Sequence, residues 1–222
     1  MVTASLVMDL GEKEEQRRAW ERLYRQESRA WRGVNRLDLP LSPGIRALDI
    51  GCGNGKSTAY LLESGCEVTG IDVSETAVQG CRERFPSAAF QVADATLLPF
   101  PDGSYDLVLM VHVLEHLDSD SRTQAMQEAW RVLAEGGTIY LQAFNRQDLR
   151  YGKGEKGTEE HSFRRGNGIV YHYFDADEIA SLAPEGCLTF CKEQVDPVRF
   201  ANDERRARWV CRFLRPSSSA ER

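Results

Sequence analysis

The stretch that most constrains the fold runs from residue 45 to 55, Ile-Arg-Ala-Leu-Asp-Ile-Gly-Cys-Gly-Asn-Gly. Its first half is typical of a short buried strand, and Gly51, Gly53 and Gly55 follow directly at alternate positions. Residues 56–64 then favour a helix. A strand that turns through glycine into a helix lets bare backbone approach a ligand, because glycine lacks the Cβ atom that would block it. The sequence therefore predicts a ligand-binding turn.

The spacing of the glycines separates three kinds of ligand site. A phosphate-binding loop needs Gly, four residues and then Gly-Lys-Ser/Thr, but Ile50 stands where its first glycine should be. A dinucleotide fingerprint fails as well, because Lys56 takes the place of its third glycine. The remaining pattern is Asp-x-Gly-x-Gly-x-Gly, from Asp49 to Gly55. Its alternative is a glycine-rich turn that binds nothing, and the residues that follow decide between the two.

Acidic residues stand at the ends of the next two predicted strands. The strand at 67–71 leads into Asp72, about 20 residues after the glycine turn, the spacing at which a carboxylate reaches a ribose in nucleotide-binding βαβ units. Val73 beside it offers an apolar side chain to an adenine face. The strand at 90–92 leads to Asp94 and Ala95, which suit an adenine amino group and a ring nitrogen.

Two further runs complete the pattern. They are Leu98-Pro-Phe-Pro-Asp-Gly-Ser-Tyr-Asp106, which leads into a strand at 107–111, and Val113-Leu-Glu-His-Leu117. In this order, over residues 45–141, the motifs resemble the class I S-adenosylmethionine (SAM) dependent methyltransferases, of the methyltransferase type 11 kind. The resemblance implies an α/β, Rossmann-like fold: a seven-stranded, mostly parallel sheet in a three-layer α/β/α sandwich, with the last strand antiparallel. It also implies methyl transfer, with SAM as cofactor and S-adenosylhomocysteine as product.

The motifs and the resemblance together indicate one set of cofactor-binding residues: Tyr24, Trp31, Asp49, Gly51, Cys52, Gly53, Asp72, Val73, Asp94, Ala95 and Val111. Val111 would offer its backbone to the methionine end of SAM. Tyr24 and Trp31 lie on a predicted amphipathic helix at 12–32 that contains neither Gly nor Pro. A leading helix in this fold can close over the cofactor, whereas we expect Trp20 to dock on the body of the domain.

The chain divides into three predicted parts. Residues 1–40 form a helical extension that covers the cofactor site, residues 41–215 form the methyltransferase domain, and 216–222 form a flexible tail. Within the domain, 145–170 lacks periodicity and is predicted to be an insertion that acts as a lid. Ser74 and Asp175 are predicted helix caps. Two strands, near 188–195 and 206–213, end the domain, and the second carries arginines on what we expect to be a solvated or salt-bridged face.

The histidines raise the questions of metal and of catalysis. His112-Val-Leu-Glu-His116 matches the H-x-x-E-H pattern of some zinc peptidases, but zinc needs a third ligand and a helix that carries the pair, so we expect no metal. Methyl transfer from a sulfonium depends mainly on alignment and exclusion of water. If the acceptor must lose a proton, the candidates are His112, His161, Tyr171 and His172, and His172 and His112 are the predicted catalytic residues. The alternatives are an aromatic core cluster for His172 and a structural hydrogen bond for His112.

The composition of the chain bears on its binding partners and its location in the cell. The net charge of −6 gives no electrostatic case for nucleic acid or anionic membranes, and no apolar run approaches the ~20 residues that span a bilayer. The start of the chain lacks a secretory pattern, and six cysteines without a Cys-x-x-Cys pair predict reduced thiols in a cytoplasmic protein.

The acceptor is predicted to be a small molecule. The run from residue 154 to 174 is loosely similar to tellurite and thiol methyltransferases. Two alternatives stay open: a tRNA methyltransferase of the wobble-uridine type, and a regulatory protein that binds SAM without catalysis. The oligomeric state is left without a prediction.

Overall fold

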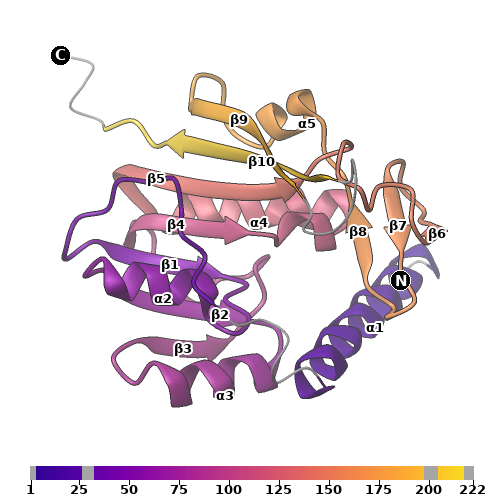
Figure 1. Ribbon diagram of the computed structural model, residues 1–222, viewed down its shortest axis with the longest axis horizontal. Coiled ribbons are helices and arrows are strands. Elements are labelled where there is room, and N and C mark those ends of the chain that lie inside the picture. The colour runs from indigo at the N-terminus through magenta and orange to yellow at the C-terminus, as the bar shows by residue number, and fades with distance from the viewer. Residues whose placement is uncertain (1–3, 27–32, 198–204, 218–222) are drawn as a thin grey trace.

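A seven-stranded sheet forms the centre of the computed structural model, which describes residues 4–26, 33–197 and 205–217 (Figure 1). The strands are β1 (Arg46–Ile50), β2 (Glu67–Asp72), β3 (Ala89–Val92), β4 (Tyr105–Val111), β5 (Leu133–Phe144), β9 (Leu188–Pro197) and β10 (Arg205–Leu214). Their order is β3-β2-β1-β4-β5-β10-β9. The strands β1 to β5 pair in parallel, whereas β10 is antiparallel to both β5 and β9. The predicted mostly parallel sheet with an antiparallel last strand is confirmed.

Helices cover both faces of this sheet. The helices are α2 (Lys56–Glu63), α3 (Glu75–Arg84), α4 (Ser119–Val132) and α5 (Ala176–Ser181), with a single 3-10 turn, η1 (Leu114–His116). Because side chains alternate along a strand, Ala47 packs with Leu61 of α2, whereas Leu48 packs with Ala125 and Met126 of α4. The result is the predicted three-layer sandwich.

The helix starts follow the capping residues of the sequence. The side chain of Ser74 accepts the backbone N–H of Ala77 at 3.2 Å, and that of Asp175 accepts the N–H of Glu178 at 2.8 Å. Each contact satisfies one of the free N–H groups at a helix N-terminus. Both predicted caps are therefore confirmed.

The last two strands carry the arginine row and a cysteine pair. Arg206 and Arg208 pair with Asp148 and Asp196 at 3.3 and 2.7 Å, which agrees with a salt-bridged face. Cys191 and Cys211 are bonded as a disulfide, because the antiparallel register of β9 and β10 places them directly opposite each other. The expectation of six reduced thiols is wrong for this pair.

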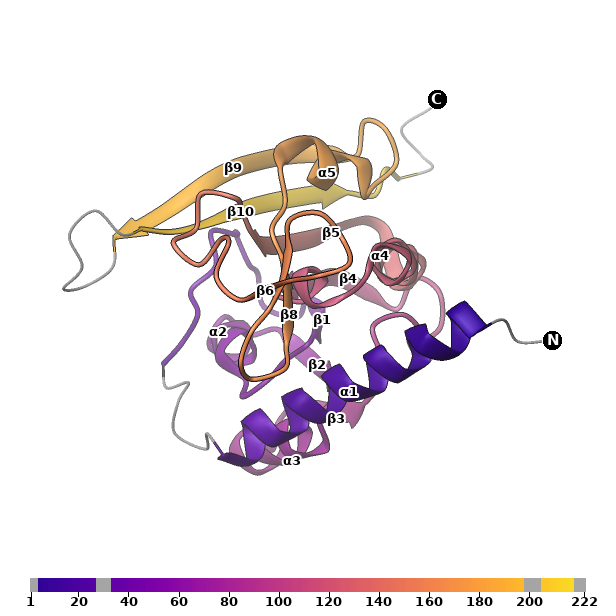
Figure 2. The same cartoon turned by 90° about the vertical axis from the view of Figure 1, so that its right-hand side faces the viewer.

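Two segments lie beyond the carboxyl ends of the parallel strands (Figures 1 and 2). One is α1 (Ala4–Gln26), and the other is a three-stranded antiparallel sheet of β6 (Glu155–Lys156), β7 (Ser162–Arg164) and β8 (Val170–His172). The stretch at 145–170, in which the sequence shows no periodicity, therefore contains two short strands. Over the described part of the chain, no helix has both the length and the apolar character to cross a membrane.

Candidate functional site

The glycine turn joins β1 to α2 in a conformation that only glycine adopts readily. Gly51, Gly53 and Gly55 have φ values of 66°, 53° and 82°. A Cβ atom at Gly51 would lie 2.7 Å from Cγ2 of Val113, and one at Gly53 would lie 2.7 Å from the hydroxyl oxygen of Tyr24. Both positions therefore require glycine for space as well as for backbone conformation.

Asp72, at the end of β2, holds the turn in place. Its Oδ2 accepts the N–H of Gly53 and its Oδ1 accepts the N–H of Ser74, both at 2.9 Å. Burial raises the pKa of Asp72 to about 6, and the charge of Glu21 adds to this, whereas the two N–H donors oppose it. The carboxylate is thus ionised at neutral pH, and it titrates within the accessible range.

Asp49 lies behind this carboxylate on the neighbouring strand. It is 2% exposed and accepts the hydroxyl hydrogen of Thr58 at 2.7 Å. Burial raises the pKa of Asp49 to about 6, and the nearby charge of Asp72 contributes. Asp49 therefore supports the turn through its contact with α2.

The ends of β3 and β4 extend the same edge of the sheet. Oδ1 of Asp94 accepts the backbone N–H and the hydroxyl of Thr96 at 2.9 and 2.8 Å, which fixes the turn after β3. At the end of β4, His112 has a φ of 59°, an uncommon value for a residue with a side chain, and its N–H donates to the carbonyl of Gln142 at 2.9 Å. Such backbone conformations are often found at functional sites.

His112, Glu115 and His116 form a cluster at this position. Nδ1 of His112 lies 2.7 Å from Oε1 of the fully buried Glu115, and its ring stacks on Phe144 with centroids 4.3 Å apart. Burial alone would raise the pKa of Glu115, but the charge of His112 and their hydrogen bond lower it overall. Nδ1 of His116 lies 2.9 Å from the carbonyl of Val170, and burial lowers the pKa of His116.

The helix α1 forms one wall of the site. Gln16 donates to the carbonyl of His116 and accepts the N–H of Val170 at 3.0 Å. Glu21 accepts hydrogen bonds from the hydroxyls of Ser74 and Thr76. Partial burial opposes the effect, but these donors lower the pKa of Glu21 to about 2. Polar contacts thus attach α1 to α3 as well as to β8.

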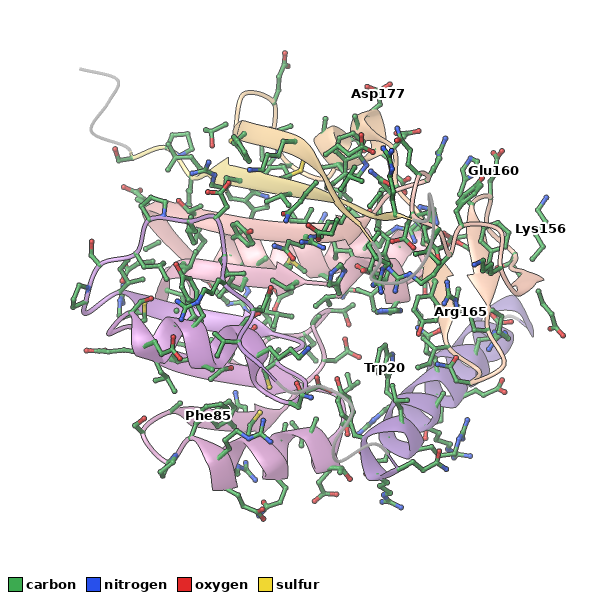
Figure 3. The ribbon with its side chains drawn as sticks, viewed as in Figure 1. Trp20, Phe85, Lys156, Glu160, Arg165 and Asp177 are labelled. Carbon is green, nitrogen blue, oxygen red and sulfur yellow. A yellow bond between two sulfur atoms is a disulfide. The ribbon has the colours of Figure 1, made fainter. Side chains whose placement is uncertain are left out.

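The short sheet β6–β8 forms a second wall, which contacts α1 through Val170 and Gln16. Glu159, between β6 and β7, accepts the N–H of Ser119 and a hydrogen from Nη2 of Arg122, each at 2.7 Å. These contacts join the insertion at 145–170 to the start of α4. Glu160 projects outward from this sheet, whereas Trp20 projects from α1 toward the strands (Figure 3).

These elements enclose a cavity of about 780 Å³. This volume is in the usual range for a small-molecule site. Seven residues that the sequence predicts for the site line the cavity: Tyr24, Gly51, Asp72, Val73, Asp94, Ala95 and His112. Asp49, Cys52, Gly53 and Val111 lie at the same strand ends but do not line it. Trp31 lies outside the described residues.

The structure places His172 away from the cavity and Trp20 in the cavity wall. His172 does not line the cavity: it is 4% exposed, with Nδ1 2.8 Å from Oγ of Ser162 and Nε2 2.8 Å from Glu178. Both ring nitrogens have hydrogen-bond partners, an arrangement that favours the structural alternative for His172. Trp20 lines the cavity, because the face of α1 that packs inward also covers the strand ends.

Four further residues of the site were not predicted: Gln16, Glu21, Glu115 and His116. The sequence carried one signal for two of them. The H-x-x-E-H run marks Glu115 and His116, but that pattern predicts at most a metal site and gives them no other role. Gln16 and Glu21 act through long-range contacts that carry no local pattern.

The fold and the cavity define a Rossmann-like α/β protein with a nucleoside-sized site at the carboxyl ends of its strands. Residues 48–141 match the family model described as a methyltransferase domain.

Two curated relatives share about half of this chain. A 27-O-demethylrifamycin SV methyltransferase of Amycolatopsis mediterranei is 39% identical over 113 residues, 48% of this chain and 41% of that protein. A demethylmenaquinone methyltransferase of Beutenbergia cavernae is 35% identical over 117 residues, 53% of this chain and 48% of that protein. The chain thus spans less than half the length of these relatives.

A solved SAM-dependent methyltransferase of Methanosarcina mazei has a TM-score of 0.70 and 27% identity, covering 82% of this chain and 100% of that one. Together, the matches and the strand order identify the domain as a class I SAM-dependent methyltransferase domain, whose cofactor is SAM.

The residues of the site fit that cofactor. The bare backbone at Gly51 leaves room where a Cβ atom would meet Val113, and Asp72 presents a carboxylate at the spacing of a ribose ligand. Val73 adds an apolar surface beside it.

Replacement of Gly51 by alanine is expected to weaken SAM binding by tenfold or more, a loss of about 1.4 kcal/mol. The left-handed backbone strains any side chain, and the new Cβ atom would also push against Val113. Gly136→Ala is the matched control, because Gly136 has a φ of 74° and open space around it. Calorimetric titration with SAM distinguishes the two variants. Equal affinities would show that the close approach at Gly51 has no role.

Proposed function

We propose that this protein transfers a methyl group from SAM to a small-molecule acceptor. The observation that carries the proposal is the convergence of Gly51, Asp72, Asp94 and His112, from four different strand ends, on one cavity of about 780 Å³. SAM, when bound, supplies an already activated methyl group. The chain's own residues then have to bind, align and shield the reactants, which accounts for up to ~7–11 kcal/mol of barrier lowering.

Within this proposal, one group of residues contacts SAM directly and a second group holds the backbone behind it. Asp72 accepts hydrogen bonds from the ribose, while Val73, Asp94 and Ala95 contact the adenine. Tyr24 covers the glycine turn, where its hydroxyl lies over Gly53. The residues Asp49, Cys52, Gly53 and Val111 act from behind, through the backbone that they hold.

The two walls of the cavity, α1 and the insertion at 145–170, have separate roles in this proposal. The helix α1 covers the cofactor, and the insertion at 145–170 acts as a lid over the acceptor, because residues from both line the cavity. A cavity closed on two sides favours a small acceptor over a polymer. The relatives' names support this, since they refer to demethylrifamycin and demethylmenaquinone. The cytoplasmic location stays a prediction from the sequence.

Calorimetry with SAM, followed by transfer of a labelled methyl group from SAM, tests the proposal. The label is screened across phenols, thiols, other metabolites, tRNA and peptides. We expect SAM binding and label in a small molecule. Label in tRNA would show that the acceptor is tRNA and not a small molecule. SAM binding without any transfer would favour a regulatory role, and absence of SAM binding would refute the proposal.

SAM binding is expected to weaken as the pH falls below about 6. The pKa of Asp72 is raised to about 6, so its carboxylate is ionised above that pH and becomes protonated below it. Protonation removes acceptor capacity toward the ribose hydroxyls, so binding should release protons and affinity should rise with pH until it levels off. Calorimetry from pH 5 to pH 8 measures the effect. In Asp72→Asn the weaker binding should vary less with pH, and a matching pH dependence in both proteins would contradict the assignment.

A further inference from the structure

The hydrogen-bond partners of two cavity histidines determine which ring nitrogen carries the hydrogen. Nδ1 of His112 faces the carboxylate of Glu115, and Nδ1 of His116 faces the carbonyl of Val170. An ionised carboxylate and a carbonyl only accept hydrogen bonds, so each neutral ring holds its hydrogen on Nδ1. Nε2 then keeps its lone pair. Over the described chain, neither Nε2 atom has a hydrogen-bond partner.

Of these two histidines, His112 is better placed than His116 to accept a proton. Glu115 behind it is fully buried, and the positive charge that His112 gains on protonation would lie 2.7 Å from this carboxylate. A base whose second nitrogen is held by an acidic group is the usual arrangement for proton removal. Three other ionisable groups lie near the ring. One is His116, whose pKa is lowered by burial. The others are Arg150 and Arg206, whose guanidinium carbons lie 3.9 and 6.0 Å from the ring centroid of Phe144.

His112 is also held in one orientation. Its backbone N–H is bonded to Gln142 and its ring is stacked on Phe144. The backbone, the ring face and Nδ1 are thus all fixed, and the remaining nitrogen belongs to a residue that lines the cavity.

The cavity wall beside His112 suits an aromatic ring. Trp20 lines the cavity and contacts the ring of His116 edge-to-face, with ring centroids 4.8 Å apart. Val113 and Leu117 add apolar surface to the same cavity. The acidity of the acceptor hydroxyl favours a phenol over an aliphatic alcohol. A phenol, with a pKa of about 10 as in tyrosine, is acidic enough for a side-chain base to remove its proton during methyl transfer, whereas an aliphatic alcohol is much less acidic.

We propose that the methyl acceptor is a phenolic small molecule whose hydroxyl proton is taken by Nε2 of His112, with Glu115 as the positioning residue. This inference rests on the proposed function and names its substrate class. The O–H bond breaks, its electron pair stays on oxygen, and the proton bonds to Nε2. The oxygen then bonds to the methyl carbon, while the sulfur of the donor keeps the pair of the bond that breaks.

The test uses the full chain saturated with S-adenosylhomocysteine and 4-nitrophenol as the probe, because the absorbance of this phenol reports its ionisation. We expect the probe to bind with a larger ionised fraction than in buffer at the same pH. Binding of the nucleoside product is measured first by calorimetry. Its absence would refute the proposed function itself, and the two failures are therefore distinguishable.

His112→Asn is the main variant, and His161→Asn is its matched control. The two histidines have φ values of 59° and 61°, which asparagine tolerates, but His161 contacts Tyr151 and does not line the cavity. In His112→Asn the bound probe should stay protonated, and label transfer to any phenol found as a substrate should fall by about 10²- to 10⁴-fold. In His161→Asn the ionised fraction of bound probe should equal that in the unaltered protein.

Glu115→Gln tests the positioning role. We expect a smaller ionised fraction of bound probe, with binding of S-adenosylhomocysteine unchanged, and recovery in Glu115→Asp. Three results would overturn the inference: no binding of the probe to the loaded protein, binding of its neutral form only, or equal ionisation in the unaltered protein and in His112→Asn.

Discussion

Replacement of Asp72 by alanine is expected to weaken SAM binding by about 1–3 kcal/mol, the cost of leaving polar groups without partners. This corresponds to a loss of affinity from several-fold to about a hundredfold. Two effects contribute. The ribose hydroxyls lose their carboxylate, and the N–H groups of Gly53 and Ser74 lose the acceptors that hold the turn at 2.9 Å.

Two variants separate these effects. Asp72→Asn keeps the shape of the side chain and one oxygen acceptor, so we expect it to lose less affinity than alanine. Asp102→Ala is the control for removal of a carboxylate elsewhere, since the side chain of Asp102 is 80% exposed and pairs with Arg131 at 2.9 Å. Thermal unfolding identifies variants that fold poorly. Unchanged affinity in folded Asp72→Ala would contradict the cofactor site as assigned.

Deletion of residues 150–168, closed with a short glycine linker, is expected to spare SAM binding and to abolish methyl transfer. The deleted stretch holds β6 and β7, and its residues line the cavity. None of the predicted cofactor residues lies within it. Without this wall, water enters the site and the acceptor loses alignment, and alignment alone accounts for up to ~7–11 kcal/mol.

A single substitution tests the same wall with less disturbance. Glu159→Gln removes the charge that contacts Ser119 and Arg122, and Glu160→Gln removes a neighbouring charge whose side chain is 83% exposed and projects outward (Figure 3). Transfer to the acceptor should fall in the first variant and stay unchanged in the second. Calorimetry with SAM and label transfer are measured on each protein. If the deletion reduces SAM binding as much as transfer, the insertion belongs to the cofactor site and is not a lid.

The sequence could predict the sheet because its signals are local. Short apolar runs indicated the parallel strands, and Ser74 and Asp175 set helix starts through contacts with residues three positions away. The cofactor half of the cavity follows from the same signals, since Gly51, Asp72 and Asp94 each stand at the end of a parallel strand.

The acceptor half could not be predicted in this way. His172 stands in an aromatic run near the cavity, yet pairing of β7 with β8 aims its ring at Ser162 and Glu178. Trp20 and Glu21 lie on a helix whose amphipathic pattern shows which face is buried but not what it covers. The disulfide between Cys191 and Cys211 depends on the register of β9 and β10, which spacing along the chain does not encode.

The contacts of Gln16 limit how the walls of the cavity can open. This one amide holds Val170 and the carbonyl of His116 at the same time, so it fastens α1 and the short outer sheet at a common point. Neither wall can swing away while the other stays docked without breaking one of these bonds. Movement of α1 and movement of the short outer sheet are therefore coupled through the side chain of Gln16.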